Sequence, residues 1–267
     1  MALTRFPELT APEVARLPAG TLALLPIGAI EQHGPHLPVA TDHLMAEAVA
    51  ERAALAAAGS CDITLLPGLA YAKSNEHAWS PGTLWLSADT LFAVLDDLGR
   101  ALSAGGVRRL AFLNAHGGNS ALLGVALREL RAKYGLFTFL LHASLPADQG
   151  GSSPAAEQGM GVHGGLHETS ALLHLRPDLV RMELATRSVP EHLGRYEHIG
   201  FGKAVAFGWL SDDFGTGNGV IGDPTGATAE LGRRLVDGAV ARAAAALREC
   251  ARFHPGPPAT PHSEETP

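Results

Sequence analysis

The stretch LALLPIGAIEQHGPHLPVATDH, residues 22–43, passes from an apolar run into a segment crowded with acids and imidazoles. The Leu- and Ile-rich start indicates a buried strand, and the Gly and Pro residues that follow indicate that the chain leaves the sheet there. Ligand sites of doubly wound α/β proteins lie where strands end and turn towards helices. The stretch therefore predicts an α/β fold with a site at this strand end, where five acids and imidazoles gather: Glu31, His33, His36, Asp42 and His43.

Apolar runs alternate with Ala-rich amphipathic stretches along the rest of the chain. This is the pattern of strands and helices that take turns around a mostly parallel sheet. Strands are predicted over 22–26, 63–66, 110–114 and 137–142, and helices over 44–58, 88–104, 120–134, 168–175 and 228–251. The small, polar segment 146–161 predicts a long loop, of the kind that often serves as a lid.

The 267 residues are 46% hydrophobic and 18% charged, which indicates one globular domain with a large core. We assign this domain to residues 1–252 and expect the Pro-rich, acidic tail, residues 253–267, to be disordered. The net charge of -7, without a basic block, argues against nucleic acid as a partner.

Neither a signal-peptide core nor the roughly 18 apolar residues of a membrane helix occur, so we expect a cytoplasmic protein without a membrane partner. The two cysteines, Cys61 and Cys250, are far apart in sequence and predict neither a disulfide framework nor thiolate ligands. Any metal would therefore be bound by nitrogen and oxygen atoms.

The first cluster suits a metal. Glu31 and His33 are two residues apart, so their side chains point the same way in an extended segment. The turn at Gly34 can bring Asp42 back towards them, and two carboxylates with one imidazole suit zinc or manganese. In the alternative interpretation Asp42 caps a helix and the other two are ordinary loop residues. Two histidines flank these residues, His36 and His43. They are expected to face solvent, and the alternative is that they orient the ligands from behind.

A second cluster, NAHGGN at residues 114–119, follows the predicted strand 110–114. The glycines after His116 let a ligand approach the backbone, and the turn would aim His116 into the same crevice. The alternative is a plain strand-to-helix turn with Asn119 as its cap. A phosphate loop is disfavoured because no Lys follows at the required spacing.

The third cluster is GVHGGLHETSALL, residues 161–173. His163 lies in a glycine-rich loop and Glu168 opens a predicted helix, where a single acid is usually only a partner of the helix dipole. Next to the first two clusters, Glu168 can complete a second metal position while His163 stays free to move protons. Two metals bridged by a carboxylate hold a water or hydroxide that attacks a carbonyl at neutral pH.

Five blocks resemble, in order, the signature blocks of the creatininase (creatinine amidohydrolase) family. They are PIGAIEQHGPHLPVATD, SNEHAWSPGT, NAHGGN, HGGLHETS and GVIGDPTGAT, and together they span about residues 20–250. The resemblance implies a three-layer α/β/α sandwich with a mostly parallel central sheet, assembled as a homohexamer. It also implies two divalent metal ions per subunit, usually zinc or manganese, with iron also accepted by such a site.

The resemblance implies a ligand set as well. Glu31 and His116 would bind one ion, and Asp42 would bridge it to the other. His33 and an acid carried by a helix would bind the second ion.

Two departures from the family pattern bear on this set. Creatininase takes the helix acid from two positions after the H-G-G histidine, where this chain has Gly118. Relatives with an H-G-G-N turn use the Glu of the E-T-S block instead, which is Glu168. His163 matches the family histidine that protonates a leaving nitrogen, but Gly164 and Leu166 replace the acid that usually lies beside it.

The implied reaction is hydrolysis of a non-peptide C–N amide bond in a small-molecule substrate, with His163 and Glu168 as catalytic residues. A cyclic amide is favoured because ring opening keeps both product halves bound. Four residues are predicted to line the pocket: Ser74, Glu76, His77 and Gly117. The first three could instead orient the ligands from behind, or could equally be loop residues satisfied locally.

Relatives with this pattern also deformylate a formylaminopyrimidine nucleotide or trim the mycofactocin precursor peptide, and both reactions are alternatives. The candidate loops carry only Lys73 as a cation for phosphate, which disfavours the deformylase. A metal-binding scaffold or sensor would not need His163 beside an open loop. A Rossmann-type cofactor binder would need G-x-G-x-x-G spacing, which the first strand-to-helix turn lacks.

Overall fold

The computed structural model describes residues 3–144, 149, 151–215 and 217–256. In this part of the chain five parallel strands form one sheet in the order β1-β3-β2-β4-β5. β2 and β4 pair from Leu22 opposite Arg109 to Ile27 opposite Asn114, so the strands that carry the first two polar clusters are central neighbours. The strands are β1 (Thr4–Arg5), β2 (Leu22–Ile27), β3 (Ile63–Leu65), β4 (Arg109–Asn114) and β5 (Phe137–His142).

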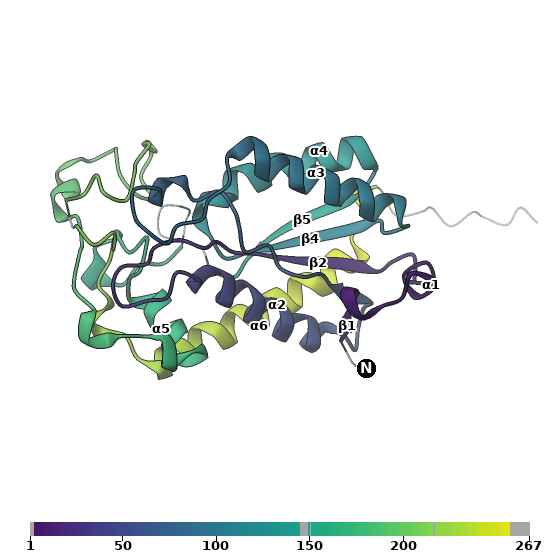
Figure 1. Cartoon of the computed structure of the whole chain (residues 1–267), viewed down its shortest axis with the longest axis horizontal. Helices are drawn as coiled ribbons and strands as arrows, with labels where there is room; N and C mark the ends of the chain where they lie inside the picture. The colour runs from purple at the N-terminus through teal and green to yellow at the C-terminus, as the bar shows by residue number, and fades with distance from the viewer. Residues whose placement is uncertain (1–2, 145–148, 150, 216, 257–267) are drawn as a thin grey trace, which may run out of the picture.

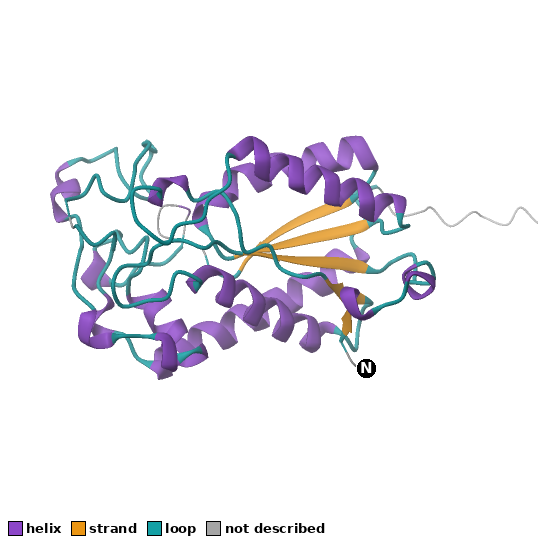
Figure 2. Cartoon of the chain, in the orientation of Figure 1, coloured by secondary structure: helices purple, strands orange, loops and turns teal. Residues whose placement is uncertain are grey.

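Helices cover both faces of the sheet, as Figures 1 and 2 show. α3 (Ala88–Ala104) and α4 (Ser120–Tyr134) lie on one face, and α2 (Thr41–Ala57) and α6 (Ala229–Arg252) lie on the other. α5 (Leu166–Leu175) packs against α6 and α2, and α1 (Ala11–Val14) is a single turn. The predicted three-layer α/β/α sandwich with a parallel sheet is confirmed.

Alternate residues of the central strands pack on opposite faces. Leu22 and Leu24 contact the α2 and α6 side, whereas Ala23, Leu25 and Ile27 contact the α3 and α4 side. Because both faces are covered, β2 is a continuous apolar run rather than an alternating one. Full burial of each Leu side chain contributes roughly 1.5–3 kcal/mol, so the sheet centre is a stable base for the loops that leave it.

Each of the nine predicted strands and helices is confirmed to within three residues at either end. The sequence analysis missed β1 and α1, which are too short to show a periodicity. It also began α2 three residues too late. Asp42 lies inside the first turn of α2 and Ala40 is the N-cap, so the interpretation of Asp42 as a cap is wrong.

The loops that follow the strands gather at one end of the molecule, at the left of Figure 1. Short 3-10 segments lie in the loops after β3, β4 and β5: Asn75–His77, Gly117–Asn119 and Ala155–Glu157. Others lie between α5 and α6, at Pro177–Leu179, Met182–Leu184, Glu191–Arg195 and Pro224–Gly226, and one lies near the N-terminus, at Phe6–Glu8. Of the predicted loop 146–161, residues 146–148 and 150 lie outside the described residues.

Residues 253–256 follow α6 as exposed chain, and the rest of the tail predicted to be disordered, residues 257–267, lies outside the described residues. Among the helices of the described chain, none combines the length and hydropathy that crossing a bilayer requires.

Candidate metal centre

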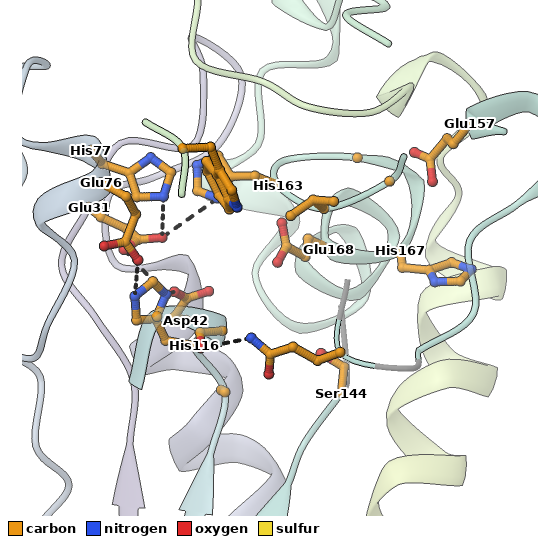
Figure 3. Close-up of a pocket in the computed structure, with 18 of the residues that line it drawn as sticks. Glu31, Asp42, Glu76, His77, His116, Ser144, Glu157, His163, His167 and Glu168 are labelled. Carbon is orange, nitrogen blue, oxygen red and sulfur yellow. Dashed lines mark hydrogen bonds and ion pairs between the residues drawn. The ribbon is translucent and has the colours of Figure 1, made fainter. Parts of the chain in front are cut away.

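The fold brings the five predicted ligand residues together at the carboxyl ends of β2 and β4. Glu31 and His33 follow β2, Asp42 is the second residue of α2, His116 follows β4, and Glu168 is the third residue of α5. Four of them are at most 5% exposed, and the Glu168 side chain is 29% exposed. Figure 3 shows the carboxylates of Glu31 and Asp42 beside the His116 ring, with Glu168 across the cavity.

Asp42 lies between two imidazoles. Its Oδ1 is 3.2 Å from His33 Nε2 and its Oδ2 is 3.0 Å from His116 Nδ1. Glu31 Oε2 is 3.3 Å from the same His116 nitrogen, and Glu168 Oε2 is 3.9 Å from His33 Nε2. Each Asp42 oxygen therefore faces a different imidazole, and each imidazole faces a second carboxylate.

Several of these buried atoms lack a hydrogen bond. Both carboxylate oxygens of Glu31, Asp42 Oδ2 and His33 Nε2 form none with any residue of the described chain. An unsatisfied buried polar atom is costly, so such a group requires a further partner. These oxygen and nitrogen atoms lie close together without bonding to one another. A cation placed between them would satisfy all of them at once, so the residues fit divalent metal ions.

The donor atoms fall into two groups that share one residue. The ligand atoms of Glu31, Asp42 and His116 lie within 4.8 Å of one another, as do those of His33, Asp42 and Glu168. The shared member is Asp42, the residue that the family resemblance implies as the bridge. A third group contains Glu31, His33 and His163, so His163 also lies at ligand distance.

The charges of the group are tightly linked. Burial raises the pKa of Glu31 and of Glu168. Burial opposes the charge on His33, but neighbouring carboxylates, Asp42 foremost, outweigh it and raise its pKa to about 10. Carboxylates likewise raise the pKa of His116 well above its usual value, although burial opposes this. Metal cations would have to displace the protons that these four side chains hold, so metal binding would release protons.

His163 is enclosed rather than free on a flexible loop. Its ring stacks on His77 at 4.0 Å and lies 4.2 Å from the His33 ring, and the residue is 5% exposed. Burial, with the charge of His33, lowers its pKa well below the usual value, so the ring is neutral. Nε2 donates to the Gln32 carbonyl oxygen at 2.6 Å, which leaves Nδ1 unprotonated, 3.6 Å from Glu31 Oε1.

His77 completes this side of the centre. Its Nδ1 lies 2.9 Å from the side-chain amide of Gln32 and 2.9 Å from Ser211 Oγ. An amide N–H donates to Nδ1, so the proton of the neutral ring is on Nε2, 3.5 Å from Glu31 Oε1. Gln32 and Ser211 therefore orient the imidazole, and neither was predicted; the adjacency of Gln32 to Glu31 was the available signal for the first.

The centre opens into a cavity of about 260 Å³. Of the four predicted pocket residues, Glu76, His77 and Gly117 line it. Ser74 is fully buried and is absent from the described lining, so its prediction as a lining residue is wrong. Trp209 and Phe207 form an aromatic wall that packs on Phe201.

Glu157 is a buried acid in the cavity wall that the sequence analysis missed. Its Oε1 accepts the backbone N–H groups of Leu166 at 2.9 Å and Asp223 at 2.8 Å. A Cβ at Gly161 or Gly165 would overlap the same carboxylate. Glu157 thus joins the loop before α5 to the segment before α6, and no motif in its neighbourhood indicated this.

His36 is also placed differently from the prediction. It is 1% exposed, and its Nε2 lies 2.9 Å from Thr169 Oγ1 of α5. The expectation that it faces solvent is wrong, because α5 folds over the loop that carries it. His43 is half-buried in the first turn of α2.

A second cavity, of about 540 Å³, adjoins the first. Both are lined by Asp42, Glu168 and His167. Its remaining wall is largely apolar and comes from α2, α5, α6 and β5, with Met45 and Leu172 among the contributors. Two of the proposed ligands, Asp42 and Glu168, therefore border both cavities.

Two relatives with similar sequences carry hydrolase names. A mycofactocin precursor peptide peptidase of Mycobacterium ulcerans (strain Agy99) is 34% identical over 250 residues, which is 88% of this chain and 86% of the relative. A creatinine amidohydrolase of Pseudomonas putida is 35% identical over 208 residues, 71% of this chain and 78% of the relative.

Solved structures agree in fold. A manganese creatininase and a mutant creatininase of Zn-Zn type each superpose with a TM-score of 0.70 at 29% identity, covering 93% of this chain and 98% of theirs. The family model described as creatinine amidohydrolase matches residues 7–247. The match spans nearly the whole described chain and includes every residue of the candidate centre, so this protein belongs to the creatininase family of hydrolases.

Proposed function

We propose that this chain hydrolyses a C–N amide bond with two divalent metal ions, zinc or manganese. The observation that supports this best is the pair of ligand groups that share Asp42. Glu31, Asp42 and His116 would hold one ion, and His33, Asp42 and Glu168 the other. Such ions lower the pKa of a water molecule and polarise a carbonyl oxygen.

The protein residues fix the geometry of this site. The N–H of Gly164 donates to Glu168 Oε2 at 2.6 Å, which holds that carboxylate towards the centre. His33 Nδ1 lies 3.2 Å from the Glu31 carbonyl oxygen, which leaves Nε2 for the ion. These contacts set the orientation of two ligands before substrate binds, as an efficient site requires.

His163 is proposed to move the proton. Its unprotonated Nδ1 can accept a proton from the attacking water, because Nε2 is already engaged by the Gln32 carbonyl. The same Nδ1 can then deliver the proton to the departing amine nitrogen, and the ring returns to its neutral state.

A small amide is the substrate we propose first, with a cyclic amide favoured. The cavity of about 260 Å³ suits a compact molecule. Glu76 neutralises Lys73, the one cation in its described lining, through a 2.8 Å ion pair. A nucleotide phosphate would thus lack a free cation there, which disfavours the deformylase.

A peptide amide is the second candidate. The adjoining apolar cavity of about 540 Å³ offers more room than a small ring needs. The peptidase relative also aligns over a larger share of this chain than the creatinine amidohydrolase does.

Homohexameric assembly and a cytoplasmic location, like the single domain over residues 1–252, stay predictions from the sequence.

One experiment tests the proposal. The purified chain is analysed for metals per subunit, and creatinine, hydantoins, lactams, formamides and short peptides are screened before and after chelation. We expect two equivalents of metal, loss of turnover on chelation and recovery with Zn²⁺ or Mn²⁺. Full turnover in metal-free protein, or a single equivalent at saturation, would contradict the proposal. Turnover of peptides without turnover of small amides would select the second candidate.

A further inference from the structure

Gly118, in the turn after β4, leaves a space that the carboxylate of Glu76 fills. A Cβ at Gly118 would overlap Glu76 Oε1 and His116 Nε2, and would lie 2.7 Å from the Lys73 carbonyl oxygen. No side chain fits there while Glu76 keeps its place. Gly118 thus leaves room for a carboxylate that enters from another segment of the chain.

Glu76 is held firmly in this position. It belongs to the 3-10 segment Asn75–His77, is 8% exposed and lines the cavity. Its Oε2 accepts an ion-paired hydrogen bond from Lys73 Nζ at 2.8 Å, and its Oε1 lies 3.3 Å from His116 Nε2. Burial opposes the charge on Glu76, but His116 and Lys73 outweigh this and lower its pKa to about 2.

The His116 ring is therefore held from both sides. Nε2 donates to the Lys73 carbonyl oxygen at 3.0 Å, with the Glu76 carboxylate beside that bond. Nδ1 faces Asp42 Oδ2 and Glu31 Oε2 in the ligand group. Partners on the outer nitrogen of a ligand histidine fix its tautomer and orientation and make the inner nitrogen a stronger donor.

We propose that Glu76 is a positioning residue of the metal centre, acting through His116 on the ion of the Glu31, Asp42 and His116 group. Gly118 makes this possible by leaving the space empty. The inference rests on the proposed function, because it presumes that this group binds an ion. It assigns Glu76 a role that the other acid of the cavity wall, Glu157, does not share.

The test is Zn²⁺ affinity in the full-length chain, measured by competition with a chelator. Glu76→Gln keeps the shape and removes the charge, and we expect one of two binding steps to weaken about 10–100-fold. Glu76→Asp keeps the negative charge but moves it further from His116. The same binding step should therefore weaken less than in Glu76→Gln. Glu157→Gln is the matched control: its carboxylate is buried in the same cavity wall and bonds backbone N–H groups, and its two steps should match the parent.

Parent affinity at both steps in Glu76→Gln would overturn the role of Glu76 and leave the proposed function standing. Equal weakening of both steps with a lower unfolding midpoint of the metal-free variant would also overturn it, because Glu76 would then support the fold generally. If the Gln variant does not fold, the Asp variant decides: weakening confined to one step supports the proposal, and parent affinity overturns it. A parent chain that binds no Zn²⁺ would overturn the metal centre itself.

Discussion

The ligand group and the wall of the cavity are built in different ways. The five proposed ligands lie just past two central strands or in the first turns of α2 and α5. In the wall, His163 and Glu157 lie between β5 and α5, with Glu157 at the end of the 3-10 segment Ala155–Glu157. His163 is held by an antiparallel bridge to Ile221, with N–O distances of 2.8 and 3.1 Å.

This difference shows what each part depends on. The ligand positions follow from where regular elements start and stop, and those limits are set by local sequence and by the buried sheet. The wall depends on hydrogen bonds between segments far apart in the chain, such as Glu157 with Asp223. We therefore expect changes in the ligand group, or in Glu76 beside His116, to alter metal binding. Changes in the wall segments that carry His163 and Glu157 should alter turnover or stability.

The largest effect is expected for Asp42→Ala. Its two oxygens face separate imidazoles at 3.2 and 3.0 Å, so the change removes a ligand from both proposed ions. We expect metal content to fall at both positions and kcat/KM to drop on the order of a thousandfold, since metal catalysis is worth several kcal/mol. Elemental analysis and steady-state kinetics measure this. Two retained equivalents with parent turnover would show that Asp42 does not bridge.

A smaller effect, confined to turnover, is expected for His163→Ala. The chain should keep both metals, because the two groups that share Asp42 do not include this residue. The kcat should fall about 10²–10⁴-fold, the usual contribution of a positioned acid or base. Loss of one metal equivalent together with turnover would instead identify His163 as a ligand, through its contact with Glu31 and His33.

The positions of the proposed ligands could be predicted from the sequence for a physical reason. Glu31 and His116 each follow a run of buried residues, and strand ends of neighbouring parallel strands meet at one edge of a sheet. Glu168 could be placed because an amphipathic helix begins at it. Only Asp42 was put in the wrong local structure, since α2 starts before its apolar pattern becomes visible.

The wall could not be predicted in the same way. Glu157 lies in a polar, glycine-rich loop, where nothing local indicates burial, and its partners Leu166 and Asp223 are nine and 66 residues away. Ser74 was expected on the cavity wall, but its position depends on how the loop after β3 folds inward. Such contacts depend on the tertiary structure, which periodicity does not encode.

The smallest effect is expected for Glu157→Gln, which tests the wall directly. The amide oxygen can still accept the N–H groups of Leu166 and Asp223, but hydrogen bonds to a charged acceptor are stronger. We expect the free energy of unfolding to fall by about 1–2 kcal/mol, measured by urea denaturation, with Zn²⁺ affinity unchanged. A loss of metal comparable to that of Asp42→Ala would mean that the wall also sets the ligand geometry, and the distinction between the two regions would fail.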